Sequence, residues 1–143
     1  MTIKQISVFL ENRAGQLAEF TDILSKNGID MRALSIAETR DFGIVRVIVD
    51  DPYKTACVLK EADYVFSITP VLGVAVSDEP GSLNKILHVL GENKINLEYS
   101  YAFITRKKDL AYMILRVEDN EKAIEALSKN NIKLVEQDEL YDL

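Results

Sequence analysis

The chain has 143 residues, 48% of them hydrophobic, so it can build one ordinary domain or two small ones, and intrinsic disorder is excluded. Its formal net charge of −6 opposes binding to a phosphate backbone, and the short basic run Arg106-Lys107-Lys108 is expected to be a solvated hairpin tip. The single cysteine, Cys57, excludes an intrachain disulfide. Because no apolar run is long enough to cross a bilayer and no signal peptide is recognised, we expect a cytoplasmic protein.

The first half of the chain alternates between strand-like and helix-like segments. Alternating apolar and polar residues indicate strands, and apolar residues that recur every three or four positions indicate helices. Gly28 is placed to end the first helix, while Asp51 and Pro52 provide the N-cap and first position of the second. The predicted elements are a strand over 3–10, a helix over 16–27, strands over 29–39 and 43–50, a helix over 52–62 and a strand over 64–68.

The same order begins again after Thr69-Pro70, a pair that is expected to interrupt the strand pattern. The second set of elements is followed by a short acidic tail over 137–143. The predicted elements are a strand over 71–76, a helix over 81–93, strands over 95–105 and 110–117, a helix over 119–130 and a strand over 132–136.

The two halves are therefore predicted to be copies of one unit. With a shift of 66 residues Gly15 falls on Gly81 and Leu17 on Leu83, and beyond the second hairpin, which is two residues longer, the shift becomes 68. The repeated order β-α-β-β-α-β is that of a split β-α-β unit. We predict an α+β fold of two tandem ferredoxin-like domains, over residues 1–70 and 71–143, each with an antiparallel sheet that carries both helices on one face.

A polar turn that contains a glycine precedes the first helix of each half. It reads Glu11-Asn12-Arg13-Ala14-Gly15-Gln16-Leu17 in the first copy and Ser77-Asp78-Glu79-Pro80-Gly81-Ser82-Leu83 in the second. Glycine lets the backbone approach a ligand closely, and the free N–H groups at the start of a helix attract an anion. The turns therefore predict a site for a small charged molecule, although capping and turn formation alone also account for these residue types.

These turns and the helix exits Gly28-Ile29-Asp30-Met31 and Lys94-Ile95-Asn96-Leu97 resemble the ACT domain, a regulatory module, over nearly the whole chain. The first turn is most similar to the serine-binding ACT domain of phosphoglycerate dehydrogenase, whose loop reads Glu-Asn-Arg-Pro-Gly. Ala14 replaces the proline of that loop, and Asp30 replaces the usual asparagine. The resemblance implies that a free amino acid binds at a domain–domain interface and that its binding regulates an enzyme or a transcription factor.

The resemblance also implies which residues bind the ligand. In the serine-binding relative, asparagines in the loop and at the start of the second strand hold it, and these positions correspond to Asn12 and Asp30 in the first half and to Asp78 and Asn96 in the second. Backbone N–H groups would bind the carboxylate, and these side-chain oxygens would bind the ammonium. The candidate binding residues are Asn12, Arg13, Ala14, Gly15, Gln16, Leu17, Asp30, Met31, Asp78, Glu79, Pro80, Gly81, Ser82, Leu83, Asn96 and Leu97.

We therefore expect a stand-alone, non-catalytic regulatory protein that uses no cofactor or metal and binds a small-molecule amino acid. It would signal through domain pairing or oligomer state, with a homodimer as the default assembly, and any target enzyme would be a separate polypeptide. We expect neither a nucleic acid nor a membrane as partner. The main alternative is a non-catalytic regulatory subunit of an amino-acid biosynthetic enzyme, similar to the small subunit of acetolactate synthase.

Other protein classes share the predicted order of elements and remain as lesser alternatives. An acylphosphatase-like enzyme needs a catalytic arginine in its phosphate loop, for which Arg13 is the candidate, whereas the second half has Glu79 there. The single histidine, His88, has no nearby partner in sequence that would make a catalytic pair. RNA-recognition motifs need aromatic side chains on the third strand, where this chain has Ile44 and Val47.

Overall fold

The computed structural model describes residues 1–143, apart from the side chain of residue 141. The chain divides into two compact units. The amino-terminal unit comprises residues 4–69, and the carboxy-terminal unit comprises residues 70–143 together with residues 1–3. The chain therefore passes from one unit to the other twice, after residue 3 and after residue 69.

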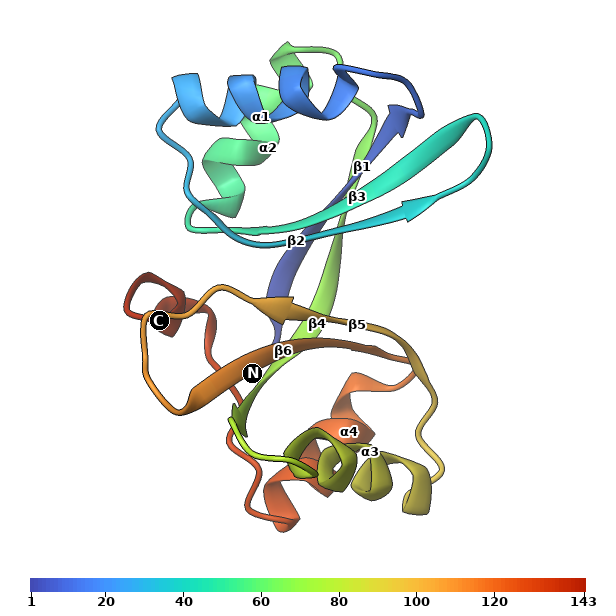
Figure 1. Ribbon diagram of the computed structural model, residues 1–143, viewed down its shortest axis with the longest axis vertical. Helices are drawn as coiled ribbons and strands as arrows, with labels where there is room; N and C mark the ends of the chain where they lie inside the picture. Colours follow the sequence, from blue (N-terminus) through green and yellow to red (C-terminus); the bar gives the residue numbers. More distant parts are fainter. The chain divides into compact units, whose positions relative to one another are not determined.

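The amino-terminal unit has two helices and four antiparallel strands in the order β2-β3-β1-β4 (Figure 1). The central pairing of β1 with β3 places Leu10 opposite Gly43, and the outer pairing of β2 with β3 places Ile36 opposite Val45. The elements are β1 (Ile3–Glu11), α1 (Gln16–Lys26), β2 (Met31–Glu38), β3 (Phe42–Val49), α2 (Pro52–Glu61) and the first part of β4 (Phe66–Ser77).

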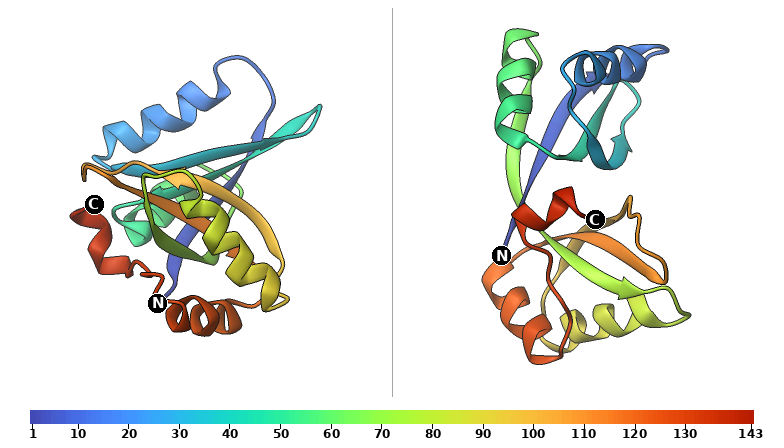
Figure 2. Two further views of the ribbon diagram at one scale, coloured as in Figure 1. Left: turned by 60° about the horizontal axis from the view of Figure 1, so that its bottom comes forward. Right: turned by 90° about the vertical axis from the view of Figure 1, so that its left-hand side faces the viewer.

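The carboxy-terminal unit repeats this plan, with strands in the order β4-β6-β5 and both helices on one side of them (Figure 2). On the other edge of β4, Val74 forms an isolated antiparallel bridge with Leu134, at the place where the amino-terminal unit has its fourth strand. The remaining elements are α3 (Ser82–Glu92), β5 (Leu97–Phe103), β6 (Leu110–Val117), α4 (Asn120–Lys129) and a short 3-10 helix, η1 (Gln137–Tyr141).

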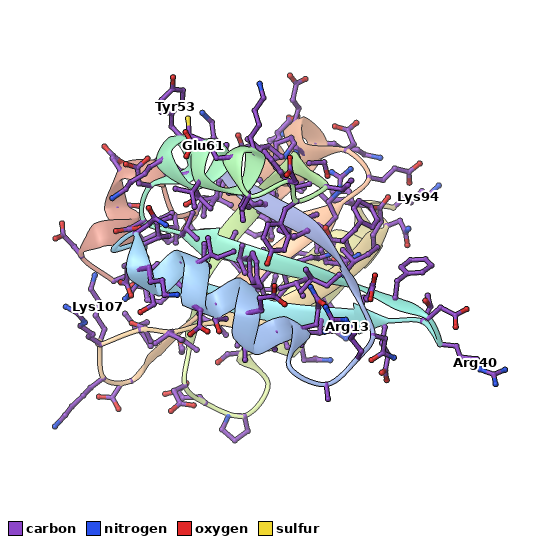
Figure 3. All side chains as sticks on the ribbon, turned by 90° about the horizontal axis from the view of Figure 1, so that it is seen from above. Arg13, Arg40, Tyr53, Glu61, Lys94 and Lys107 are labelled. Atoms are coloured by element: carbon purple, nitrogen blue, oxygen red, sulfur yellow. The ribbon has the colours of Figure 1, made fainter. Side chains whose placement is uncertain are left out.

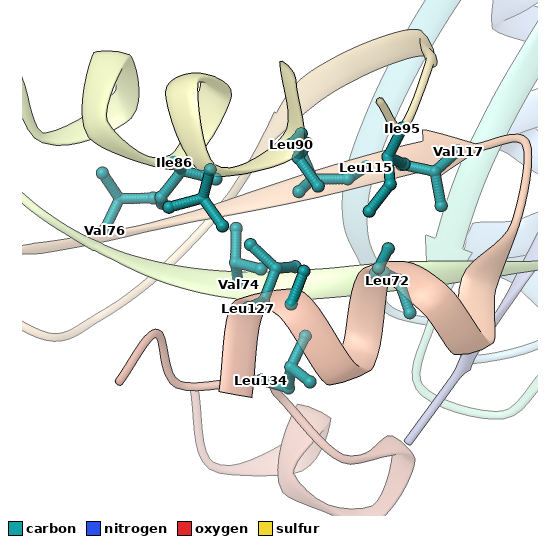
Figure 4. Close-up of a cluster of buried hydrophobic side chains, with 13 residues drawn as sticks. Leu72, Val74, Val76, Ile86, Leu90, Ile95, Leu115, Val117, Leu127 and Leu134 are labelled. Carbon is teal, nitrogen blue, oxygen red and sulfur yellow. The ribbon is translucent and has the colours of Figure 1, made fainter. Parts of the chain in front are cut away.

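Each unit has its own hydrophobic core between its helices and its strands. In the amino-terminal unit Phe20, Leu24 and Leu59 from the helices pack on alternate residues of β1 and β3. In the carboxy-terminal unit Leu90 and Leu127 pack in the same way on β4 and β6 (Figure 4). These side chains are at most 1% exposed, and burying a side chain of this size stabilises the fold by about 1.5–3 kcal/mol.

The α+β class and the tandem ferredoxin-like plan predicted from the sequence are confirmed. The predicted cap of α2 is also present, because the Asp51 carboxylate accepts a hydrogen bond of 2.9 Å from the Lys54 N–H. In α4, Asp119 accepts the equivalent bond, of 3.1 Å, from the Lys122 N–H. No helix among the described residues is both long and apolar enough to cross a membrane.

Three details of the predicted elements are wrong. Thr69-Pro70 does not break the strand pattern, since β4 runs through it and the fixed φ of proline suits extended backbone. The predicted strand over 132–136 is reduced to the bridge at Leu134. The acidic tail contains η1, which a capping box begins, and its Leu140 and Leu143 are buried, so the tail is part of the packed carboxy-terminal unit.

Candidate functional site

The two glycine-containing turns have the same backbone conformation. Gly15 and Gly81 adopt left-handed φ angles of 84° and 88° at the N-cap positions of α1 and α3. An L-residue with a side chain is strained in this region, which explains why glycine occupies both positions. No described side chain caps either helix, in contrast to the Asp51 and Asp119 carboxylates that cap α2 and α4. In the first turns the Gln16 and Ser82 N–H groups donate to the Arg13 and Glu79 carbonyls at 3.3 and 3.2 Å. The next N–H groups, of Leu17 in α1 and of Leu83 in α3, are left for water or for a ligand.

Backbone hydrogen bonds fasten each turn to the hairpin that follows. The Asn12 N–H donates to the Asp41 carbonyl at 3.1 Å, and the Asp78 N–H donates to the Asp109 carbonyl at the same distance. In the first turn the Asn12 side-chain amide adds bonds to the Thr39 carbonyl at 3.0 Å and the Arg40 carbonyl at 3.4 Å. The amide nitrogen of Asn12 thus holds the tip of the β2–β3 hairpin, and Oδ1 is the atom that the residue can offer to a ligand.

A pocket of about 210 Å³ lies beside the first turn. It has the volume of about seven water molecules, at about 30 Å³ each. Side chains from the end of β1, the start of α1 and the β2–β3 hairpin surround it, so the turn and the hairpin bond described above position its walls. The lining residues are Leu10, Glu11, Asn12, Arg13, Gln16, Leu17, Ile36, Glu38, Gly43 and Val45.

Arg13 and Gln16 give this pocket its polar character, and both also line a second hollow of about 340 Å³ that Tyr64 and Val65 line as well. Arg13 lies beside the start of α1 (Figure 3), where its Nε is 3.0 Å from a carboxylate oxygen of Glu11 and one terminal nitrogen is 3.8 Å from Glu19. The Gln16 Oε1 atom is buried, and it has no hydrogen-bond partner among the described residues. A buried acceptor without a donor costs free energy, about 1–3 kcal/mol, which a bound donor would recover.

The structure brings four of the predicted site residues of the first half together in this pocket, namely Asn12, Arg13, Gln16 and Leu17. Ala14 and Gly15 form the turn itself. Asp30 and Met31 lie beyond the other end of α1 and do not line the pocket. The Asp30 carboxylate is 3.3 Å from the Arg32 guanidinium, and Met31 packs against the hydrophobic core.

The predicted residues of the second half are distributed over different places. Asn96 lines a polar hollow of about 510 Å³ beside the start of α4, and Ser82 lines another of about 380 Å³ beside the start of α3. Leu83 and Leu97 pack against the core of the carboxy-terminal unit. Asp78, Glu79, Pro80 and Gly81 form the exposed turn.

Six residues that line the first pocket were not among the binding residues predicted from the sequence, and two of them, Leu10 and Glu11, come from the end of β1. Ile36 and Glu38 come from β2, and Gly43 and Val45 come from β3. The predicted ferredoxin-like plan contained a signal for Gly43 and Val45, because residues opposite Leu10 and its neighbours in an antiparallel pair share its face. The sequence pattern alone does not give the register of this strand pair. The register decides which β3 residues lie opposite Leu10 and its neighbours.

Comparison of the chain with models of known protein families identifies one matching family. The model of the ACT domain pair matches residues 1–143. A crystal structure of protein BT0572 from Bacteroides thetaiotaomicron has 39% sequence identity and a TM-score of 0.93, over 100% of this chain and 98% of that one. The ligand-free regulatory subunit of aspartate kinase from Thermus thermophilus has 16% identity and a TM-score of 0.64, over 88% and 90% of the chains, which shows a shared fold. No curated protein sequence matches the chain.

Proposed function

Because the chain belongs to the ACT domain pair family, we propose that it is a regulatory protein whose ligand is a free amino acid, bound in the pocket beside the Gly15 turn. The observation that carries this proposal is the buried Gln16 Oε1, an acceptor without a partner among the described residues, at the start of a helix that no described side chain caps. Donor and acceptor groups for both ends of a zwitterion thus occur at one place.

The proposed chemistry follows from these groups. The ligand carboxylate accepts hydrogen bonds from the N–H groups of Leu17 and Ala18 in the first turn of α1, where the helix dipole adds about 0.3–1 kcal/mol. The ammonium donates to Gln16 Oε1, with Asn12 Oδ1 as a second acceptor. Hydrogen bonds in which one partner is charged are worth about 1.5–3 kcal/mol, so each contact is a measurable part of the affinity.

Regulation would follow by linkage. A ligand that binds the folded, correctly paired form stabilises it by RT ln(1 + [L]/Kd), about 2.7 kcal/mol at a hundredfold excess over Kd. Any partner that recognises this form is then regulated, and the partner changes the ligand affinity by the same factor. We propose that the signal passes through domain pairing or through a homodimer, and that the chain itself has no catalytic role.

A second version of this role is a non-catalytic subunit of an amino-acid biosynthetic enzyme. The aspartate kinase regulatory subunit of Thermus thermophilus favours this version, because the shared fold covers 88% of this chain and 90% of that subunit, so the two chains are of similar length. Co-expression with candidate enzymes, followed by size-exclusion chromatography, separates the two versions, since only a subunit co-elutes with its enzyme.

A thermal-shift screen of the twenty amino acids tests the proposed function. At a hundredfold excess over Kd the stabilisation of about 2.7 kcal/mol raises Tm by several degrees, at about 2–4 °C per kcal/mol. Gln16→Met removes the acceptor and keeps the side-chain size, so it should weaken binding about 10–100-fold. Gln16→Glu keeps an acceptor and serves as the matched control. The proposal fails if no amino acid raises Tm, or if Gln16→Met responds as the wild type does.

A further inference from the structure

The pocket beside the Gly15 turn has an apolar inner wall and a polar rim. Leu10 and Val45 are only 6% and 2% exposed, Gly43 is buried, and Leu17 is half-buried. Among the polar lining residues Glu11, Asn12, Arg13 and Glu38 are exposed, and Gln16 is half-buried. A molecule with one charged end and one apolar end matches this distribution, with its charged end at the rim and its apolar end against the inner wall.

The charges of the rim argue against a second charge on the ligand. Two carboxylates, of Glu11 and Glu38, and one guanidinium, of Arg13, line the pocket. The guanidinium already has Glu11 at 3.0 Å and Glu19 at 3.8 Å. A ligand side chain that lies against the inner wall meets only apolar residues, so a charge of either sign on it would be unpaired there, which costs free energy. An acidic side chain would also be repelled by the two rim carboxylates.

The space in the pocket depends on a glycine that the backbone does not require. Gly43 is an ordinary strand residue of β3, opposite Leu10 of β1. A Cβ added to it would lie 3.7 Å from the Ala37 carbonyl oxygen and 3.8 Å from the Ile36 Cγ2, which are ordinary contacts. Alanine at position 43 would therefore cause no clash. The absence of a side chain at Gly43 leaves free volume beside Ile36.

The repeat shows what larger residues do at the same positions. In the carboxy-terminal unit the residue opposite Val76 is Ala111, and the residue opposite Val74 is Met113. They correspond to Gly43 and Val45, and both pack against the hydrophobic core of their unit. In the amino-terminal unit, smaller residues at both positions leave the volume that the pocket occupies.

We propose that this pocket selects an amino acid with an uncharged aliphatic side chain, of about the size of valine, and that Gly43 sets the upper limit of that size. The proposal rests on the proposed function and adds the class of ligand to it. Each further methylene that the ligand buries tightens Kd about fourfold, so valine should bind about fifteenfold more tightly than alanine.

Isothermal titration calorimetry on the full chain tests this ligand class. Threonine has the shape of valine with a hydroxyl in place of one methyl, so it is the matched control ligand, and valine should bind at least tenfold more tightly. Aspartate and lysine should bind more weakly than either. If threonine, serine, aspartate or lysine binds more tightly than valine, the aliphatic selectivity is refuted and the proposed function stands. If no amino acid binds, both are refuted.

Substitution at Gly43 tests the second part. Gly43→Ala should lower the valine-to-alanine affinity ratio about tenfold or more, while circular dichroism shows an unchanged fold. Gly91→Ala, the same change in α3 with no described atom within 4 Å of the added Cβ, should leave the ratio unchanged. If Gly43→Ala has the same valine-to-alanine affinity ratio as the wild type, the role of Gly43 is refuted. Because the substitution adds only one methyl group, the test does not require a larger side chain that could prevent folding.

Discussion

Alanine should lower stability at Gly81, the N-cap of α3, and raise it at Gly91, near the end of that helix. Gly81 has φ of 88°, and Gly91 is an ordinary residue near the end of the helix. No described atom lies within 4 Å of the Cβ added at either, so neither change creates a clash. At Gly81 the left-handed backbone costs an L-residue about 1–2 kcal/mol, offset by about 0.4–1 kcal/mol from the stiffer unfolded chain. With the middle of each range, the net loss is about 0.8 kcal/mol. At Gly91 alanine gains about 0.5–1 kcal/mol.

Urea denaturation followed by circular dichroism measures both free energies in the same unit of the protein. With an m-value of about 2 kcal/mol/M, the two midpoints should differ by about 0.8 M, with Gly81→Ala below the wild type and Gly91→Ala above it. Two shifts of the same sign, or a Gly81→Ala midpoint equal to that of the wild type, would show that the left-handed turn does not require glycine.

Three further changes have expected outcomes. Asp51→Ala removes the hydrogen bond that the Lys54 N–H donates, so it should lower the free energy of unfolding by about 1 kcal/mol in a urea titration. An unchanged free energy of unfolding would show that this cap does not stabilise α2. Lys94 holds φ of 56° after α3, so Lys94→Gly should raise the urea midpoint, and a lower midpoint would contradict this reasoning. Burial, and then the Glu19 carboxylate, raises the pKa of Tyr64 above 10.0. This phenol therefore contributes stability below about pH 10, and that stability is lost as the pH rises further. Glu19→Gln should lower the pKa of Tyr64 in an ultraviolet titration, and an unchanged pKa would refute the contribution of Glu19.

The sequence was sufficient to predict the tandem plan because the signals for it are local. Glycine at positions 15 and 81, the Asp51 cap and the apolar periodicity of each helix all act within a few residues of where they occur. The continuation of β4 through Thr69-Pro70 was not predicted, because proline only forbids donation to the ladder and does not forbid extended backbone. The burial of Leu140 was missed because it depends on tertiary packing of the tail.

The candidate site could be predicted only in part for a similar reason. Asn12 and Gln16 belong to the turn, so a motif in the sequence identifies them. Gly43 and Ile36 reach the same pocket through strand pairing, and a one-residue slip of that register would have placed other side chains there. The buried state of the Gln16 carboxamide oxygen has no sequence signal, because it arises from tertiary packing around the start of α1.

Titration of the ¹⁵N-labelled protein with free amino acids, followed by NMR of the backbone amides, tests the binding site most directly. The amide signals of Gly15, Gln16 and Leu17 should move with a single saturating curve, together with those of Gly43 and Val45, while the Gly81 signal moves less. Saturable shifts confined to residues outside this pocket, or no shift with any amino acid, would contradict the account.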